Sequence, residues 1–257
     1  MHRSLLFSVL SLGLAAPGGA FVLSAGAEAK APPDHRRPDV AGPQNKSSTA
    51  SPWPEGFVDV SAVAPSVVID LKYATADNFV GARIDGYEAN RAILTLPAAL
   101  ALGAAAAELA NQGLGLKVFD AYRPQRAVQH FLRWAQSPAP APRAATRHPG
   151  LSRRDLFRLG YLSLESAHVR GSAVDVTLLE PGPDGGWREM DLGTPYDYFS
   201  PASGDDAREL TPPQRAARAR LRAIMVKHGF VPSPREWWHF TLADEPYPDD
   251  YYDFPVR

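Results

Sequence analysis

Ser166-Ala-His168-Val-Arg-Gly171-Ser-Ala-Val-Asp175 joins a glycine turn to a stretch with strand character. From Ser172 to Leu179 the residues alternate in the strand sense, with Asp175 on one face and Val174 on the other, which points into the core. A turn at Gly171 would let His168 come from the loop and Asp175 from the strand, both facing one point. Acidic side chains are rare in such an apolar strand unless paired, although a single structural acid remains the plainer interpretation of Asp175 alone.

A second segment, Glu236-Trp-Trp-His239, supplies another imidazole and another carboxylate. Two imidazoles and one carboxylate could bind zinc and leave its fourth position open, as catalytic zinc sites do. Glu236 could then take a proton from a water in that position. Residues three apart in a strand point to opposite faces, so we expect Glu236 in the turn after Pro232-Ser-Pro234 and His239 in an aromatic strand ending at Leu242. The Glu-x-x-His spacing is weak evidence by itself, because it often arises by chance.

Other signals predict strands and helices that do not alternate regularly. We expect strands at 67–71 and 116–119, and helices at 97–111, 124–135 and 211–228, from apolar periodicity with Pro or Gly at the ends. The predicted fold class is therefore α+β, a mixed or antiparallel sheet with packed helices in a single domain. The Pro- and Ala-rich segment 137–149 is expected to be a long surface loop, with His148 as an ordinary residue in it.

Arg123 lies at the junction between the predicted strand at 116–119 and the helix that Pro124 opens. Side chains at such junctions are held firmly on a scaffold, so we expect Arg123 at the edge of a cleft. The bulky Trp237 and Trp238 are expected to form wall and core rather than to stack on a substrate.

The first residues predict an export signal that is not part of the fold. Met1-His2-Arg3 is positive, no charged residue follows from Ser4 to Ala27, and Ala25-Gly26-Ala27 has the small-x-small form of a cleavage site. An uncleaved membrane anchor is the alternative, because this uncharged run could nearly span a bilayer. Pro17-Gly18-Gly19 interrupts the run and favours cleavage. The predicted product is a periplasmic or secreted bacterial protein with no membrane span in its mature form.

The remaining chain divides into a linker and one domain. Residues 28–54 are rich in Pro, Ala, Ser and Asn, which predicts a disordered tether. Residues 55–257 have the length of a single domain and show no internal repeat.

Composition limits the chemistry that is available. The chain has no cysteine and a formal net charge of -1. The absence of cysteine excludes disulfides, so any metal must be held by His, Asp or Glu. The net charge argues against a nucleic-acid partner, which needs a basic face.

Several further segments accompany the two ligand segments in a characteristic order. They are Lys72-Tyr73-Ala-Thr-Ala-Asp-Asn78-Phe79, Asp85-Gly-Tyr-Glu88, Asp120-Ala-Tyr-Arg123-Pro124, Gly193-Thr-Pro-Tyr-Asp197 and Asp244-Glu-Pro-Tyr-Pro. Together with Ser-x-His-x-x-Gly-x-Ala-x-Asp and Glu-x-x-His, this pattern resembles the zinc-dependent D-alanyl-D-alanine dipeptidases, the VanX-type branch of the zinc D,D-peptidase superfamily. The resemblance covers roughly residues 55–257 and implies one hedgehog/D,D-peptidase-like domain.

The resemblance implies a metal centre and two catalytic side chains. His168, Asp175 and His239 would hold one zinc ion per chain. Glu236 would be the general base that activates water and then protonates the leaving amine. Arg123 would bind the oxyanion of the tetrahedral intermediate.

The resemblance also implies a substrate, the free dipeptide D-Ala-D-Ala, which would be split into two D-alanines during cell-wall peptide turnover. Tyr73, Ser166 and Asp197 match positions that contact the dipeptide's ends, and Asp197 suits the ammonium group. The predicted signal favours recycling of wall-derived dipeptides over interception of cytoplasmic ones. Alternatives are a D,D- or L,D-carboxypeptidase or endopeptidase acting on peptidoglycan stem peptides, and a non-catalytic zinc-binding module.

Overall fold

The computed structural model describes residues 52–257, so the predicted signal and nearly all of the predicted tether lie outside the described residues. The strands are β1 (Phe57–Asp59), β2 (Val68–Ile69), β3 (Ile93–Thr95), β4 (Gly115–Asp120), β5 (Ala173–Pro181), β6 (Trp187–Glu189), β7 (Phe230–Pro232) and β8 (His239–Leu242). The helices are α1 (Val60–Val63), α2 (Leu96–Ala110), α3 (Gln125–Gln136), α4 (Ala144–Arg147), α5 (Arg153–Arg158) and α6 (Pro212–Lys227), with 3-10 turns η1 (Lys72–Ala74), η2 (Ala167–Arg170) and η3 (Pro201–Ser203). None of these helices is long and apolar enough to cross a membrane.

A mixed sheet forms the centre of the fold. Its strand order is β2-β4-β5-β8-β7, and β6 pairs with β5. β2 runs parallel to β4, and the other pairs in this sheet are antiparallel. β1 and β3 form a separate antiparallel pair. The predicted α+β class, with a mixed sheet and packed helices, is confirmed.

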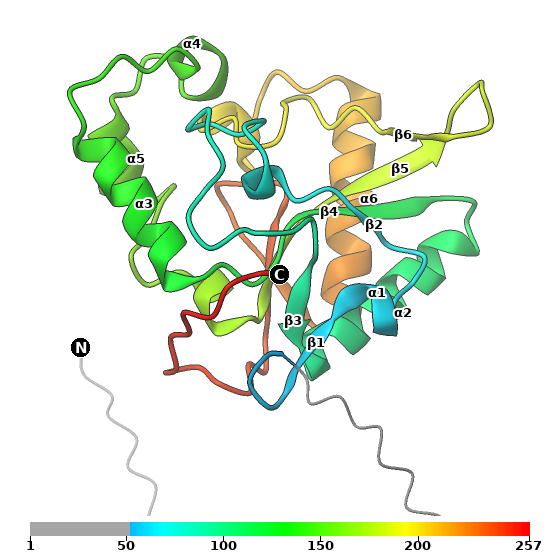
Figure 1. The fold of residues 1–257 in the computed structure, drawn as a ribbon. Coiled ribbons are helices and arrows are strands. Elements are labelled where there is room, and N and C mark those ends of the chain that lie inside the picture. The colour runs from blue at the N-terminus through cyan, green and yellow to red at the C-terminus, as the bar shows by residue number, and fades with distance from the viewer. Residues whose placement is uncertain (1–51) are drawn as a thin grey trace, which may run out of the picture. The chain divides into compact units, whose positions relative to one another are not determined.

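The longer helices lie in two groups, of which α2 and α6 pack on the sheet while α3 and α5 lie to one side of it (Figure 1). α2 and α6 pack against each other, α2 also contacts β4, and α6 contacts β5 and β7. α3 and α5 pack together elsewhere, with α4 near them in the view. Thr211 caps α6 by accepting a hydrogen bond from the backbone N–H of Gln214, which is why the helix begins at Pro212.

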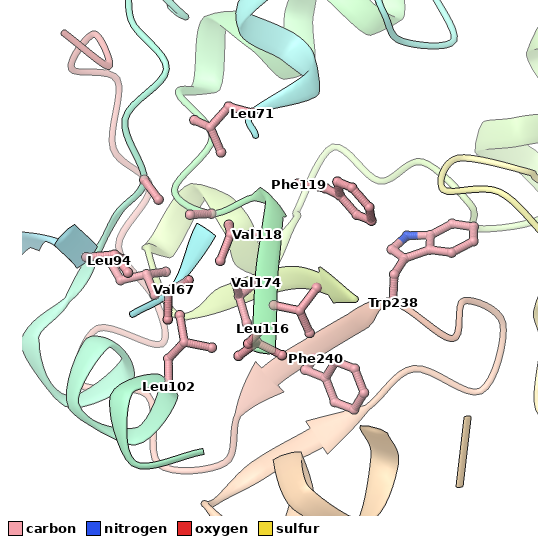
Figure 2. Close-up of a cluster of buried hydrophobic side chains, with 14 of the residues drawn as sticks. Val67, Leu71, Leu94, Leu102, Leu116, Val118, Phe119, Val174, Trp238 and Phe240 are labelled. Carbon is pink, nitrogen blue, oxygen red and sulfur yellow. The ribbon is translucent and has the colours of Figure 1, made fainter. Parts of the chain in front are cut away.

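Apolar side chains from β4, β5, β8 and α2 form the core beside the sheet. Figure 2 shows Leu116 and Val118 of β4 close to Val174 of β5, with Phe240 of β8 and Leu102 of α2 around them. Sequence alternation predicted a core on the Val174 face of β5. The structure buries both faces from Ala173 to Leu179, because β5 is central and its other face carries the polar site described below.

Strand register places distant polar residues side by side. Asp175 of β5 lies opposite His239 of β8 and, across its other edge, opposite Asp120 of β4. Directly opposed residues on antiparallel strands point to the same face. The β4–β5 register shifts between Val118 and Asp120, an irregularity of the kind that re-aims side chains. These three side chains therefore meet on one face of the sheet.

The 137–149 segment is more ordered than a surface loop, because it contains α4. His148 is only 2% exposed, and its ring meets that of Trp134 edge-on at 5.9 Å between centroids. Its Nδ1 donates to the carbonyl of Leu151 at 2.8 Å. The expected surface-loop position is wrong for His148, because packing on α3 buries its ring and no local sequence pattern signals that contact.

Candidate active site and metal centre

The three predicted metal ligands meet at one point. His168 Nε2 and Asp175 Oδ1 are 3.2 Å apart, His239 Nδ1 and Asp175 Oδ1 are 3.0 Å apart, and the two nitrogens are 3.1 Å apart. A tetrahedral ion with bonds of about 2.0–2.1 Å needs ligand atoms about 3.3 Å apart. The donor set therefore fits a metal ion, and within residues 52–257 it is the one His/Asp/Glu group gathered closely enough to do so.

Neighbouring groups fix which ring nitrogen of each histidine faces the ligand point. The carbonyl of Ala121 can only accept, so His168 Nδ1 donates to it at 2.7 Å and leaves the Nε2 lone pair free. The hydroxyl of Thr241 lies 3.3 Å from His239 Nε2, which leaves Nδ1 to face Asp175. Such outer contacts orient metal-binding imidazoles and set their tautomers.

The electrostatics of the cluster favour the ligating forms of its members. Burial alone would raise the pKa of Asp175, but His168 and His239 hold this pKa far below its usual range. Burial lowers the pKa of His239. Metal ligation needs an ionised carboxylate and neutral imidazoles, and both shifts favour these states. Tyr196 also donates to Asp175 Oδ2 at 3.0 Å.

The η2 turn presents His168 to the strand. Ser166 caps η2, and its hydroxyl accepts from the backbone N–H of His168 at 3.3 Å. Gly171 ends the turn at a φ of 73°, in the left-handed region that glycine tolerates best. A Cβ at Gly171 would collide with the ring of Phe57. The glycine thus allows the sharp entry into β5 that the sequence pattern predicted.

Arg123 lies just beyond β4 as a buried, fixed cation. Its Nε and Nη2 donate to Asp120 Oδ2 at 3.0 and 2.8 Å, and Tyr87 donates to Asp120 Oδ1 at 2.5 Å. Burial alone would lower the pKa of Arg123, but Asp120 and other neighbours keep this pKa well above its usual value. Arg123 Nη2 is 4.0 Å from Asp175 Oδ2. The guanidinium therefore lies permanently charged beside the predicted metal ligands.

Asp197 is a further buried carboxylate near the ligand cluster, in addition to Asp175. The hydroxyl of Tyr73 lies 3.2 Å from each Asp197 carboxylate oxygen. Burial, and then the negative charge of Asp175, raises the pKa of Asp197 to about 8. Among residues 52–257, no Lys or Arg forms an ion pair with this carboxylate. Its φ of 58° is the only positive value for a non-glycine residue in the described chain, a type of strain that often occurs at functional sites.

Glu236 lies in the turn before β8, as the sequence predicted. Its carbonyl accepts from the backbone N–H of His239 at 3.2 Å, and its side chain is half-buried. Burial, followed by the negative charges of Asp175 and Asp197, raises the pKa of Glu236 well above its usual value. A cation on the neighbouring ligand set would oppose this shift and favour the carboxylate.

One cavity of ≈ 180 Å³ connects these groups. All eight predicted site residues line it, namely Tyr73, Arg123, Ser166, His168, Asp175, Asp197, Glu236 and His239. Trp237 and Trp238 are largely buried, at 9% and 1% exposure, in agreement with the expected wall and core positions. The structure thus brings together every residue that sequence reasoning singled out, while their individual roles stay predictions.

Comparison with known proteins identifies the family. The model of the peptidase M15 family, described as D-Ala-D-Ala dipeptidase, matches residues 54–257. The chain belongs to the peptidase M15 family. The family resemblance expected from the sequence is therefore confirmed, and the chain is a peptidase of this family.

Individual members of the peptidase M15 family are similar over most of the domain. The chain is 42% identical over 202 residues to a D-alanyl-D-alanine dipeptidase of Streptomyces coelicolor, covering 78% of this chain and 98% of that protein. A D-alanyl-D-alanine dipeptidase of Enterococcus faecium is 39% identical over 204 residues, with 79% and 98% coverage. One from Escherichia coli is 32% identical over 186 residues, with 72% and 84% coverage.

Three residues near the site of this peptidase M15 member carried no predicted role. Asp120 and Tyr196 stood within recognised segments, but their bonds to Arg123 and Asp175 depend on strand register and tertiary contact. Tyr161 lines the cavity from the loop after α5. Its sequence surroundings carry no pattern that would have indicated this position.

Proposed function

We propose that this protein hydrolyses the free dipeptide D-Ala-D-Ala to two D-alanines with the help of a bound zinc ion. The observation that carries the proposal is the small cavity in which the three-ligand cluster, Arg123 and Glu236 line one space. The names of relatives that align over 98% of their length support the same activity.

The ligand cluster supports zinc as the ion. Two nitrogens and one carboxylate oxygen form a common catalytic zinc set, and the chain has no cysteine for thiolate sites. When bound, such an ion supplies Lewis-acid polarisation of water and of the scissile carbonyl.

One side chain transfers the proton, and another stabilises the negative charge that develops in the reaction. Glu236 accepts the proton of the attacking water and passes it to the leaving amine. Arg123 stabilises the negative charge that develops on the carbonyl oxygen. The two hydrogen bonds from Arg123 to Asp120 hold the guanidinium in place before the reaction, so little reorganisation is needed.

The charged ends of the dipeptide supply its recognition. An ammonium group against Asp197 would favour the ionised carboxylate, because a nearby opposite charge offsets burial. Tyr73 fixes the orientation of that carboxylate, and Ser166 lines the same cavity. D-Alanine side chains offer little apolar contact, so specificity depends on both termini and on exclusion of longer peptides.

Purified, zinc-loaded protein is expected to release D-alanine from free D-Ala-D-Ala with a kcat/KM at least about 100-fold above that for a stem pentapeptide ending in D-Ala-D-Ala. Chromatographic quantitation of D-alanine measures both rates. Cleavage of the pentapeptide alone would overturn the proposal and indicate a carboxypeptidase. Retention of metal without cleavage of either peptide would indicate a non-catalytic module.

We also propose that the protein is exported and acts on wall-derived dipeptides, a role supported by the charge pattern from Met1 to Ala27. We expect the mature chain to begin at Glu28 and to fractionate outside the cytoplasm. Mass spectrometry of the N-terminus, combined with cell fractionation, measures both properties. A full-length chain in the membrane fraction would indicate an anchor, and a full-length cytoplasmic chain would contradict export.

A further inference from the structure

We propose that Arg147 is a positioning residue, which holds the 196–199 segment so that Asp197 faces the amine end of the substrate. The inference rests on the proposed function, because it assigns Arg147 a part in recognising that amine. Arg147 ends α4 in the 137–149 segment and does not line the cavity. It would therefore act through Asp197 rather than by touching the dipeptide.

Arg147 holds the 196–199 segment at two points. Its Nη1 donates to the carbonyl of Tyr196, the residue immediately before Asp197. Its own backbone carbonyl accepts from the N–H of Phe199 at 2.7 Å. The two contacts lie on either side of Asp197, so they restrain the peptide that precedes this residue and the chain that follows it.

The backbone of the restrained segment is strained at Asp197. Asp197 has a φ of 58°, which costs energy in a residue with a Cβ even though Asp tolerates this region better than most. Strained conformations persist only where surrounding contacts over-determine them. The side-chain contact from Arg147 to Tyr196 is one of those contacts, and it comes from a different part of the chain.

The charge of Arg147 also acts on Asp197. Burial and Asp175 raise the pKa of Asp197, while Arg147 and then Arg123 oppose this rise. Arg147 thus favours the carboxylate that an ammonium group requires, in addition to holding its backbone.

A carboxylate on a third segment also forms an ion pair with Arg147. Arg147 Nη2 is 3.6 Å from Asp77 Oδ1, and Asp77 also contacts Lys72 Nζ at 3.1 Å. Lys72 directly precedes Tyr73, whose hydroxyl holds the Asp197 carboxylate. The Arg147–Asp77 pair therefore ties the backbone support of Asp197 to the segment that carries its side-chain partner.

Arg143 provides a matched control within the same segment. Its Nη1 is 3.4 Å from the same Asp77 oxygen, so it shares the charge partner of Arg147. Among the described hydrogen bonds, Arg143 makes none to the 196–199 segment. Removing Arg143 thus tests loss of charge near Asp77 without loss of the restraint on Asp197.

We expect Arg147→Ala, purified as the full metal-loaded chain, to raise the KM for D-Ala-D-Ala about tenfold while kcat changes less than about threefold. Propionyl-D-alanine, which lacks the amine, should inhibit the variant and the wild type with the same inhibition constant. Arg147→Lys should give an intermediate KM, since it keeps the charge but not the planar fork. Arg143→Ala should match the wild type, and Arg147→Ala/Asp197→Asn should be no worse than Asp197→Asn alone.

Three outcomes would overturn the inference: an unchanged KM in Arg147→Ala, an equal loss of affinity for propionyl-D-alanine, or the same KM rise in Arg143→Ala. Metal content and thermal unfolding of each variant identify a folding defect. If Arg147→Ala has such a defect, the KM of Arg147→Lys relative to the wild type decides whether Arg147 positions Asp197. Failure of the proposed function is seen separately, as a wild-type protein that does not cleave D-Ala-D-Ala. Failure of the positioning role is seen only in the ratio of the variant's KM to the wild-type KM.

Discussion

Glu236→Gln is expected to lower kcat for D-Ala-D-Ala by about 10²- to 10⁴-fold while bound metal is retained, because the amide matches the carboxylate in shape but cannot accept the proton. Glu236 is not one of the three ligand residues, so the ligand cluster stays intact. Steady-state kinetics with metal analysis of the same sample measures both quantities. Glu236→Ala is expected to behave similarly.

The matched control for this substitution is Glu165→Gln, a glutamate that lines the same cavity but lies outside the proposed proton path. It tests whether loss of any negative charge from the cavity wall lowers the rate. A wild-type rate in Glu236→Gln, or an equal loss in Glu165→Gln, would contradict the assignment of Glu236 as the base.

His168→Ala is expected to abolish measurable turnover by removing the metal. Loss of an outer partner of a metal-bound histidine already weakens affinity about 10- to 100-fold, so loss of a ligand should weaken it by at least about 100-fold. Without the metal, the buried Asp175 carboxylate lacks the positive charge that the ion would supply, so we also expect a lower melting temperature. Metal titration and thermal unfolding measure these effects.

His130→Ala serves as the control for loss of an imidazole. His130 Nδ1 accepts from the backbone N–H of Asp85 at 3.2 Å and takes no part in the cluster. The control should bind metal and turn over substrate like the wild type. Full metal occupancy in His168→Ala would show that Asp175 and His239 suffice without it, contrary to the proposed site.

The sequence indicated the candidate ligand residues because their chemistry is local to short segments. His168, Gly171 and Asp175 are close enough in sequence to suggest a turn and a strand, and the position of Glu236 followed from strand geometry alone. Family resemblance was still needed to join these segments and to bring in Tyr73 and Asp197. The mixed sheet was predictable from the pattern of strands and helices, but its strand order was not.

The parts that sequence reasoning missed depend on contacts between distant segments. Asp120 faces Asp175 through strand register, and His148 is buried because α4 and α5 bring it against α3. Arg147 donates a hydrogen bond to the carbonyl of Tyr196, although the two residues are 49 positions apart in the sequence. Such contacts leave no periodicity or spacing in the sequence, because each is specified only once the fold has formed.

The pairing of β5 with β8 has a consequence for when the ion is acquired. Asp175 and His239 become neighbours only when the last strand of the sheet docks, near the end of the chain. A polypeptide in which β8 has not yet docked therefore lacks a complete set of donors, and binding of a metal ion would be coupled to the closing step of folding. The surroundings in which β8 docks would consequently determine which metal ion this site acquires.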